Sequence, residues 1–482
     1  MKKKSLMKNS IYNVLYRILS ILFSLVSSAY VARILMAESI GKVSAAQNLV
    51  SYFTIFATMG IPTYGVQLIG KLQFKDDEKN KNFTELFIIN FVLTLFCSII
   101  YFVVIGSLDY FQSRRLLYII AGVNILANFI NVDWFYQGLQ EYKYIAVRSL
   151  IIKFVSLIVL VTAVKDANDY IIYAGICSFS TVGNYILNLV KLPKLVKFSF
   201  KNLEFKKHIK HIALLFAATI AAEVYVLADT TMLEHMCGST IVGYYTISSR
   251  IISIARSIVI AISAVFLPQL SLLHNNGEEK KFIELSNKGL HILACLSIPA
   301  SIGLILVAKE MILVMFGDGF YNSILVTQIL AFSITTVAFS NFLGLQILVA
   351  IGKEHVTTIS TVCGAIINII LNLLLIRQFA HVGAAIASAI TELMVTLIQI
   401  IFVRKYIKLN INIFKIFISA FIMTIVLILA NLIPAHIFIK LILKVLVGAI
   451  IYMGFLLLLK DEFALTIINK FKFKRKSNLW KE

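Results

Sequence analysis

The sequence predicts an all-α, polytopic membrane protein of about 14 transmembrane helices, as two six-helix bundles with pseudo-two-fold symmetry plus two accessory helices. Of the 482 residues, 59% are hydrophobic, and the mean hydropathy of +0.89 is too high for an ordinary soluble domain. Apolar stretches of about 18 residues or more recur along the whole chain, and each can cross about 30 Å of hydrocarbon.

The predicted spans follow one another along the whole chain. The first comes after a lysine-rich start and has no small-residue cleavage site, so we expect it to be retained rather than removed as a signal peptide. The spans cover residues 9–33, 43–70, 84–106, 115–137, 144–164, 168–190, 211–233, 242–270, 287–308, 322–351, 356–376, 382–403, 412–433 and 437–459.

Basic residues are distributed unevenly between the two sides of the predicted membrane. Most of the 45 Lys and Arg residues fall at the N-terminus, in the loops after even-numbered spans and in the C-terminal tail. This is the positive-inside pattern, which predicts a multi-pass protein with both termini in the cytoplasm. The net charge of +21 therefore indicates membrane topology rather than nucleic-acid binding, and the tail can also contact anionic lipid headgroups of the bilayer.

Short patterns recur in the two halves of the chain. YQGLQEYKYIAVRS after span four has a counterpart in LVAIGKEHVTTIS after span ten. Because each half has an even number of spans, the halves share one orientation, as in transporters built from parallel repeats. The last two spans have almost no interior polarity and are expected to be accessory. The predicted domains are an N-terminal bundle (1–194), a basic cytoplasmic linker (195–210), a C-terminal bundle (211–408) and the accessory helices with the tail (409–482).

Polar side chains form narrow stripes at helical spacing on spans one, six and eight. A surface that faces lipid needs no polar residues, so each stripe predicts contact with a cavity or with another helix. The residues that we expect to line a substrate cavity are Asn13, Arg17, Ser20, Ser24, Asn184, Asn188, Arg250, Ser253 and Arg256.

The three arginines are the most informative members of these stripes. A charged side chain at mid-membrane costs about 2.5–3.5 kcal/mol or more, and a planar guanidinium can bind phosphate through two hydrogen bonds. The arrangement favours a water-filled, cationic cavity for an anionic headgroup. The alternatives are that Arg17 extends to the membrane surface, and that Arg250 or Arg256 forms a structural ion pair with Glu223 or Asp229.

Catalytic and metal-binding motifs are not found. The chain has no P-loop, no nucleophile–base spacing and no carboxylate pair at the membrane face, so we expect a transporter rather than an enzyme. The five cysteines are scattered without metal-ligand spacing and are expected to be packing residues. His208 and His211 lie in a lysine-rich loop and are expected on a solvated face. We therefore predict no metal and no cofactor.

An aromatic corner, DWFYQGLQEYKY, separates spans four and five. Its rings at Trp134, Tyr136, Tyr142 and Tyr144 are of the kind that favours the membrane–water interface. We therefore interpret this corner as an interfacial anchor and hinge, and two roles stay open for Asp133: fixing the corner or capping a polar contact.

Four segments together resemble the Wzx-type polysaccharide flippases, which translocate O-antigen or capsule repeat units and belong to the multidrug/oligosaccharidyl-lipid/polysaccharide exporter superfamily. They are ARILMAESIGKVSAAQNLVSYFTIFATMGIPTYGVQLIGK, DWFYQGLQEYKYIAVRS, GYYTISSRIISIARSIVIAISAVFLPQLS and FLGLQILVAIGKEH, within a similarity over about residues 5–410. The resemblance implies two six-helix bundles around a V-shaped cavity that opens alternately to each side. It implies, as substrate, an undecaprenyl-pyrophosphate-linked oligosaccharide that moves from the cytoplasmic to the outer leaflet.

The same resemblance implies a cellular location and partners for the protein, and it raises alternative functions. We expect a monomer in the bacterial cytoplasmic membrane that works with a polysaccharide polymerase and glycosyltransferases. Drug exporters of the superfamily often carry an acid in span one, whereas residues 9–33 contain none. Lipid II flippases share the arginines of spans one and eight, but their pattern has a basic residue within span two, where this chain has only Lys42 at the entry. A membrane glycosyl-transferring enzyme or polymerase and a non-transporting scaffold are the alternatives from other classes.

A coupling cation is also implied by the resemblance, either sodium or a proton. The matching positions for a sodium site are Asp229, Asn368, Asn372 and Ser388. Oxygen ligands four residues apart on one helix face suit a hard cation. The family site usually has a second carboxylate where Asn372 stands, and hydrogen bonds between packed helices are the alternative role for these residues.

Overall fold

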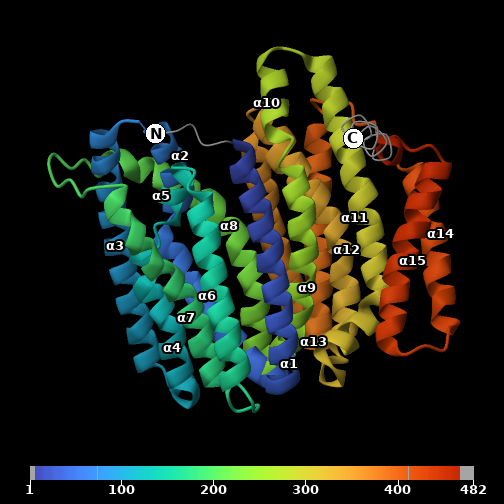
Figure 1. The fold of residues 1–482 in the computed structure, drawn as a ribbon, viewed down its shortest axis with the longest axis horizontal. Helices are drawn as coiled ribbons and strands as arrows, with labels where there is room; N and C mark the ends of the chain where they lie inside the picture. Colours follow the sequence, from blue (N-terminus) through green and yellow to red (C-terminus); the bar gives the residue numbers. More distant parts are fainter. Residues whose placement is uncertain (1–5, 73, 411, 467–482) are drawn as a thin grey trace, which may run out of the picture. The chain divides into compact units, whose positions relative to one another are not determined.

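The structure is a computed structural model that describes residues 6–72, 74–410 and 412–466, apart from the side chains of residues 6–18, 217–219, 221 and 222. Within these residues the chain is helical and contains no strand. Ten helices among the described residues are long and apolar enough to cross a membrane. The predicted spans all fall on helical segments, so the all-α membrane fold class is confirmed (Figure 1).

The chain divides into two compact units, Met1–Gly243 and Tyr244–Glu482. The sequence places the boundary between the bundles in the linker 195–210, whereas the first unit extends to Gly243. It includes helix α8 (Lys206–Cys237) because α8 packs against α1 and α2. The helices of the first unit are α1 (Leu6–Thr58), α2 (Ile61–Lys71), α3 (Asp76–Ser107), α4 (Arg115–Leu126), α5 (Asp133–Gly138), α6 (Tyr142–Ala163), α7 (Tyr170–Lys191), α8 (Lys206–Cys237) and the start of α9 (Ser239–Ser263).

Within the described residues, the second unit contains the rest of α9 and the helices α10 to α15. A π-helical segment, Phe342–Leu348, continues α12. These helices are α10 (Leu267–Asn275), α11 (Glu279–Phe316), α12 (Ser323–Asn341), α13 (Glu354–Val403), α14 (Phe414–Leu429) and α15 (Ile437–Leu458).

Two long helices each cover two predicted spans because they bend at one residue. The backbone of α1 leaves the helical region at Met36 (φ 59°), and that of α13 does so at Ala380 (φ 47°). A glycine follows each bend closely. A Cβ at Gly41 would lie 1.7 Å from the Ser239 carbonyl oxygen, and one at Gly383 would lie 2.2 Å from the Leu375 oxygen. The absence of a side chain therefore lets the chain pack backbone against backbone just after each bend.

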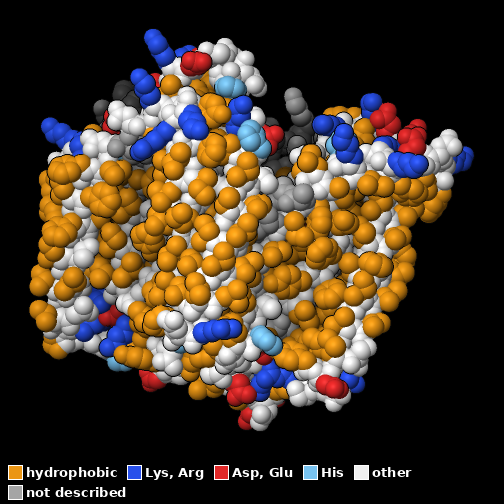
Figure 2. Space-filling view, turned by 180° about the vertical axis from the view of Figure 1, so that it is seen from behind, with side chains coloured by type: hydrophobic (Ala, Val, Ile, Leu, Met, Phe, Trp, Pro, Cys, Tyr) orange, Lys and Arg blue, Asp and Glu red, His pale blue; other side chains and the backbone are white. Residues whose placement is uncertain are grey.

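Side chains on the outside of the helices are suited to lipid. On the face shown in Figure 2, hydrophobic side chains cover a broad middle band, and charged side chains gather toward the ends of the helices. Large apolar residues such as Phe96, Ile370 and Phe421 are exposed on α3, α13 and α14. This distribution is the one expected of a protein that has hydrocarbon around it and water only at its two margins.

The aromatic corner is part of the core of the first unit, so its interpretation as an interfacial anchor is wrong for the innermost rings. Trp134 and Tyr136 are buried together with Phe83. The Phe83 ring stacks on Trp134 with a centroid distance of 5.6 Å. A Cβ at Gly65 would lie 2.3 Å from the Trp134 ring, so the glycine allows α2 to cover these aromatic side chains.

Asp133 fixes this corner from the inside. Its carboxylate accepts hydrogen bonds from the buried Arg148 guanidinium and, at 2.9 Å, from the Asn188 side-chain amide. The Tyr136 hydroxyl donates to the Asn188 carbonyl oxygen, which ties α5 to α7 a second time. The acid is therefore the centre of a polar junction between α5, α6 and α7.

Two further expectations about polar residues are wrong. His208 is buried rather than solvated, because its Nε2 lies 2.7 Å from the Glu85 carboxylate and its Nδ1 lies 2.9 Å from the Tyr64 hydroxyl. The last span also has a polar interior, since Lys444 of α15 is buried and pairs with Glu310 of α11. In both cases a partner distant in sequence supplies the hydrogen bond or opposite charge that the buried group needs, and only the fold brings that partner near.

Candidate functional site

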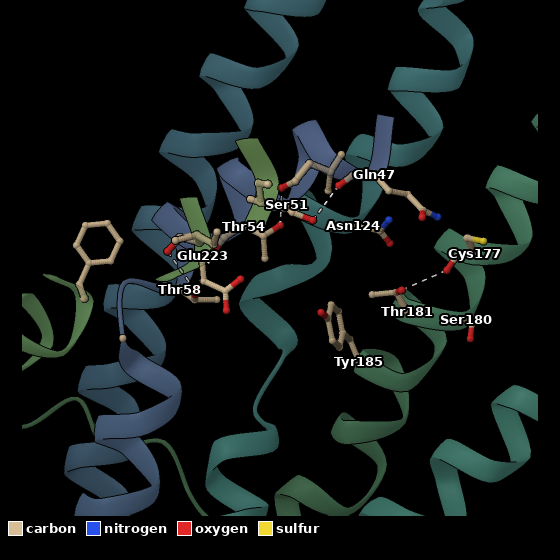
Figure 3. A pocket seen from close by; sticks show the side chains of 15 residues that line it. Gln47, Ser51, Thr54, Thr58, Asn124, Cys177, Ser180, Thr181, Tyr185 and Glu223 are labelled. Carbon is tan, nitrogen blue, oxygen red and sulfur yellow. Dashed lines mark hydrogen bonds between the residues drawn. The ribbon is translucent and has the colours of Figure 1, made fainter. Parts of the chain in front are cut away.

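A polar cavity of about 700 Å³ lies within the first unit (Figure 3). Four helices, α1, α4, α7 and α8, supply its walls, together with Gly60 at the start of α2. Most of the lining residues carry hydroxyl, amide or carboxylate groups. They are Gln47, Val50, Ser51, Thr54, Ile55, Thr58, Gly60, Asn124, Cys177, Ser180, Thr181, Tyr185, Phe216, Glu223 and Leu227.

The α1 wall is a polar stripe that the sequence itself encodes. Gln47, Ser51, Thr54 and Thr58 follow one another at intervals of three or four residues, which places them on one helix face. Each of the three hydroxyls donates to a backbone carbonyl four residues earlier, at 2.9 Å. Their donor needs are thus met within the helix, and their oxygen lone pairs remain to accept hydrogen bonds from a ligand.

The opposite wall comes from α7 and α4. Figure 3 shows Thr181 and Tyr185 across the cavity from Thr54, Thr58 and the Glu223 carboxylate. Thr181 donates to the Cys177 carbonyl oxygen at 3.2 Å, so its hydroxyl is oriented in the same way as those on α1. The cavity therefore offers many neutral hydrogen-bonding groups and one acid.

No Lys or Arg belongs to the described lining of this cavity. Two of the residues expected to line a cavity from span one, the polar Asn13 and the cationic Arg17, have side chains that lie outside the described residues. Ser20 is half-buried and its Oγ has no hydrogen-bond partner among the described residues, whereas Ser24 is exposed. Neither serine lines the cavity.

The two asparagines predicted on span six face the polar junction and their own helix rather than the cavity. Asn188 is fully buried and donates to Asp133, and Asn184 donates to the Ser180 carbonyl oxygen at 2.7 Å. Thr181, one turn before Asn184 on the same stripe, does line the cavity. Sequence reasoning missed the α1 stripe from Gln47 to Thr58, although its helical spacing is the same signal that identified the other stripes.

In the second unit, the predicted arginines lie on α9. The Arg256 guanidinium lies 3.4 Å from the Glu392 carboxylate of α13, and its side chain is 24% exposed. This arginine therefore has an acid partner, but that acid is Glu392 rather than Glu223 or Asp229, the two acids named in the ion-pair alternative. Arg250 is half-buried, and Ser253 is exposed and donates to the Arg250 carbonyl oxygen at 2.9 Å. A role for these residues in substrate binding stays a prediction.

The residues predicted to bind a coupling cation are buried, with Asp229 on α8 of the first unit and the others in the second. The Asn372 amide donates to the Asn368 side-chain oxygen at 3.0 Å, and Ser388 contacts the Tyr245 hydroxyl at 3.3 Å. The Asn368 oxygen, one of the expected ligands, is therefore engaged in a hydrogen bond along α13. This geometry favours the helix-packing role, and the cation site stays a prediction.

Comparison with known families identifies the chain. The polysaccharide biosynthesis protein family matches residues 6–274, more than half of the sequence. The chain belongs to this family. The family of the lipid II flippase MurJ also matches, over residues 155–455. Together the two matches bear out the resemblance to Wzx-type flippases of the multidrug/oligosaccharidyl-lipid/polysaccharide exporter superfamily.

Curated relatives of this polysaccharide biosynthesis protein cover most of its length. The putative O-antigen transporter of Shigella dysenteriae is 22% identical over 386 residues, which are 79% of this chain and 95% of the relative. The putative O-antigen transporter of Escherichia coli K12 is 23% identical over 412 residues, or 84% of this chain and 98% of the relative.

Solved structures show the same fold. The lipid II flippase MurJ, in an inward closed conformation, aligns with a TM-score of 0.73 and 17% identity, over 94% of this chain and 99% of its own. The relatives and fold neighbours are transporters and flippases, so the prediction of a multi-pass membrane transporter, and not an enzyme, is confirmed.

Proposed function

We propose that this protein moves undecaprenyl-pyrophosphate-linked oligosaccharide repeat units from the cytoplasmic to the outer leaflet of a bacterial cytoplasmic membrane, for capsule or O-antigen assembly. The observation that carries the proposal is the hydroxyl-rich cavity of about 700 Å³ inside an apolar bundle. The names of the relatives, O-antigen transporters in two cases, support the same substrate class. Both termini would lie in the cytoplasm, as the distribution of Lys and Arg indicates.

The cavity suits the sugar part of such a substrate. Its volume falls within the range of about 300–1,000 Å³ that is usual for ligand pockets. Serine, threonine, asparagine and glutamine side chains exchange hydrogen bonds with sugar hydroxyls as they do with water, so a glycan headgroup can leave water at low cost. The Tyr185 ring adds an apolar face. The prenyl tail would remain in the surrounding lipid.

The charged pyrophosphate requires a cationic side chain, and the described lining of the cavity contains no Lys or Arg. Arg256 has a partly exposed side chain and a buried acid, Glu392, beside it. A diphosphate could replace that carboxylate as the partner of the guanidinium, because guanidinium binds phosphate oxygens through two parallel hydrogen bonds. Arg17 and Arg250 would contribute further positive charge. Transport would follow alternating access, coupled to sodium or protons through Asp229 and its predicted partners.

A gene deletion tests the proposed function. Cells without the gene should accumulate repeat-unit lipid on the cytoplasmic leaflet and lose the surface polymer, and the wild-type gene should restore both. A variant with valine at Thr54 and Thr181 should restore them poorly. Normal polymer in the deletion strain, with unchanged leaflet distribution of the lipid, would contradict the proposal. The polymerase and glycosyltransferases that act before and after transport are the expected functional partners of a monomeric transporter.

Translocation of lipid II is the second candidate function. It is favoured by the match of residues 155–455 to the MurJ family and by the fold shared with the lipid II flippase structure. Expression of this chain in cells depleted of their own lipid II flippase separates the two functions. Restored growth of the depleted cells would favour lipid II as the substrate. Lysis of the depleted cells, together with restored polymer in a mutant that lacks its repeat-unit flippase, would favour the oligosaccharide.

A further inference from the structure

Three potential metal ligands meet in the second unit, outside the sites described above. His291 and Cys295 lie four residues apart on α11, and Asp461 lies just after the end of α15. The spacing of four residues places the imidazole and the thiol on one helix face. Sequence reasoning missed the group because the third member is 166 residues beyond Cys295.

The distances between the ligand atoms match a tetrahedral metal ion. The His291 Nε2 lies 3.1 Å from Asp461 Oδ1, and the Cys295 Sγ lies 3.6 Å from that nitrogen and 3.9 Å from the same Oδ1. Zinc bonds of about 2.0–2.3 Å at tetrahedral angles place nitrogen, sulfur and oxygen ligands about 3.4–3.6 Å apart. The three atoms therefore need to move by only a few tenths of an ångström to bind one ion.

The chemistry of the three groups also suits a divalent transition metal. Imidazole nitrogen, thiolate and carboxylate are the usual protein ligands of zinc. A thiolate and a carboxylate together carry two negative charges, which neutralise a divalent cation. Because Cys295 and Asp461 are both buried, a neutral complex of this kind avoids leaving net charge in the protein interior.

Asp461 is held in place by its surroundings rather than by the other ligands alone. The chain turns at Lys460 (φ 51°), whose carbonyl oxygen accepts a hydrogen bond from the Lys415 ammonium at 3.1 Å. The Asp461 carboxylate also accepts the Phe463 backbone N–H at 3.0 Å. On the other side, the Tyr452 hydroxyl of α15 donates to the Cys295 carbonyl oxygen at 2.9 Å. The two sides of the group are thus positioned independently of any metal.

An adjoining cavity gives the group access to solvent. This cavity has a volume of about 460 Å³ and is lined by His291 and Asp461. Its charged rim contains two lysines and two glutamates, so the rim itself does not repel a cation; these residues are Glu284, Lys288, Lys415 and Glu462. A cavity of this size can supply a water molecule as the fourth ligand.

We propose that His291, Cys295 and Asp461 bind one divalent transition metal ion of the zinc class, with water from the adjoining cavity as the fourth ligand. The ion would fasten the segment after α15 to α11, and would add to the contacts that α15 already makes with α11. This site is separate from the polar cavity of the first unit and does not depend on the proposed transport function.

Cobalt titration of the purified, full-length protein in detergent tests the proposal. Cobalt bound by a thiolate produces a charge-transfer absorption that cobalt bound only by nitrogen and oxygen does not. We expect this absorption to saturate at one equivalent of Co²⁺ per chain, and one equivalent of Zn²⁺ to abolish it. Cys295→Ala should eliminate the absorption, and Asp461→Asn should weaken cobalt binding at least about tenfold.

Cys363→Ala is the matched control, because Cys363 is a cysteine of the same unit that does not belong to the group. This variant should bind cobalt as the wild type does. Zinc should also raise the melting temperature of the wild type and of Cys363→Ala, and leave that of Cys295→Ala unchanged. Absence of the thiolate absorption in the wild-type protein would overturn the proposal whether or not the variants fold, and so would an identical absorption in Cys295→Ala. The group would then be a hydrogen-bonded packing contact.

Discussion

Replacing Asp133 by asparagine is expected to destabilise the first unit, because the Arg148 guanidinium would lose its counter-charge. The Arg148 side chain is 3% exposed, and Asp133 is its acidic partner. Its Nε and Nη1 atoms have no hydrogen-bond partner among the described residues, so Asp133 is central to its stabilisation.

The burial of the two side chains determines how much stability the Asp133→Asn variant should lose. Breaking a buried ion pair from one side costs about 3–5 kcal/mol when both groups are shielded from water. The Asp133 side chain is 34% exposed, so solvent already screens part of its attraction for Arg148. The rings of Tyr136 and Tyr144, each 5.8 Å from the guanidinium carbon, retain some attraction in the variant. We therefore expect a loss of about 2–3 kcal/mol.

Thermal unfolding in detergent, followed by the fraction of protein that remains monodisperse, measures this loss. The matched control is Glu38→Gln, which removes the acid of the more exposed Lys42–Glu38 pair and should cost less than about 1 kcal/mol. A second variant, Asp133→Asn combined with Arg148→Met, should recover much of the stability because no charge remains buried. Equal melting temperatures for Asp133→Asn and Glu38→Gln would refute the reasoning.

Three other predictions follow from the same structure. Gly41→Ala should lower the melting temperature, by a cost of about 1–3 kcal/mol, because its Cβ would lie 1.7 Å from a backbone oxygen. Glu310→Gln should destabilise α15 by leaving the buried Lys444 ammonium without its carboxylate, which limited proteolysis of the C-terminal segment would detect. The double variant Thr54→Val and Thr181→Val should reduce glycolipid transport about tenfold at unchanged stability, because two hydrogen bonds of about 0.5–1.5 kcal/mol each are lost from the cavity.

Each of these has a matched control within the chain. Gly106→Ala places its Cβ in open space and should leave the melting temperature unchanged. Thr162→Val removes an exposed hydroxyl that makes the same bond to its own helix as Thr54 does, and should not affect transport. Combining Glu310→Gln with Lys444→Met should restore resistance to proteolysis. A transport defect in Thr162→Val as large as that in Thr54→Val and Thr181→Val would contradict the proposal that the cavity hydroxyls bind the substrate.

The sequence alone determined the class of the protein and the position of its helices. Hydropathy and helical spacing are local properties, so the apolar stretches could be assigned to spans without knowledge of their neighbours. The order and spacing of the aromatic and glycine-containing segments also sufficed to indicate the superfamily. The polar stripe on α1 was equally visible in the sequence, and the structure places it along the wall of the polar cavity.

The tertiary structure alone decided which polar side chains face one another. His208 gave no sign of burial, because Glu85, which holds it, is 123 residues away in the chain. The bends at Met36 and Ala380 contain neither proline nor glycine, so packing around the nearby glycines, and not local propensity, sets those conformations. Asp461 likewise meets His291 and Cys295 only after α15 has packed on α11. A buried polar group requires a partner, and which partner it finds depends on how the helices pack rather than on the order of residues along them.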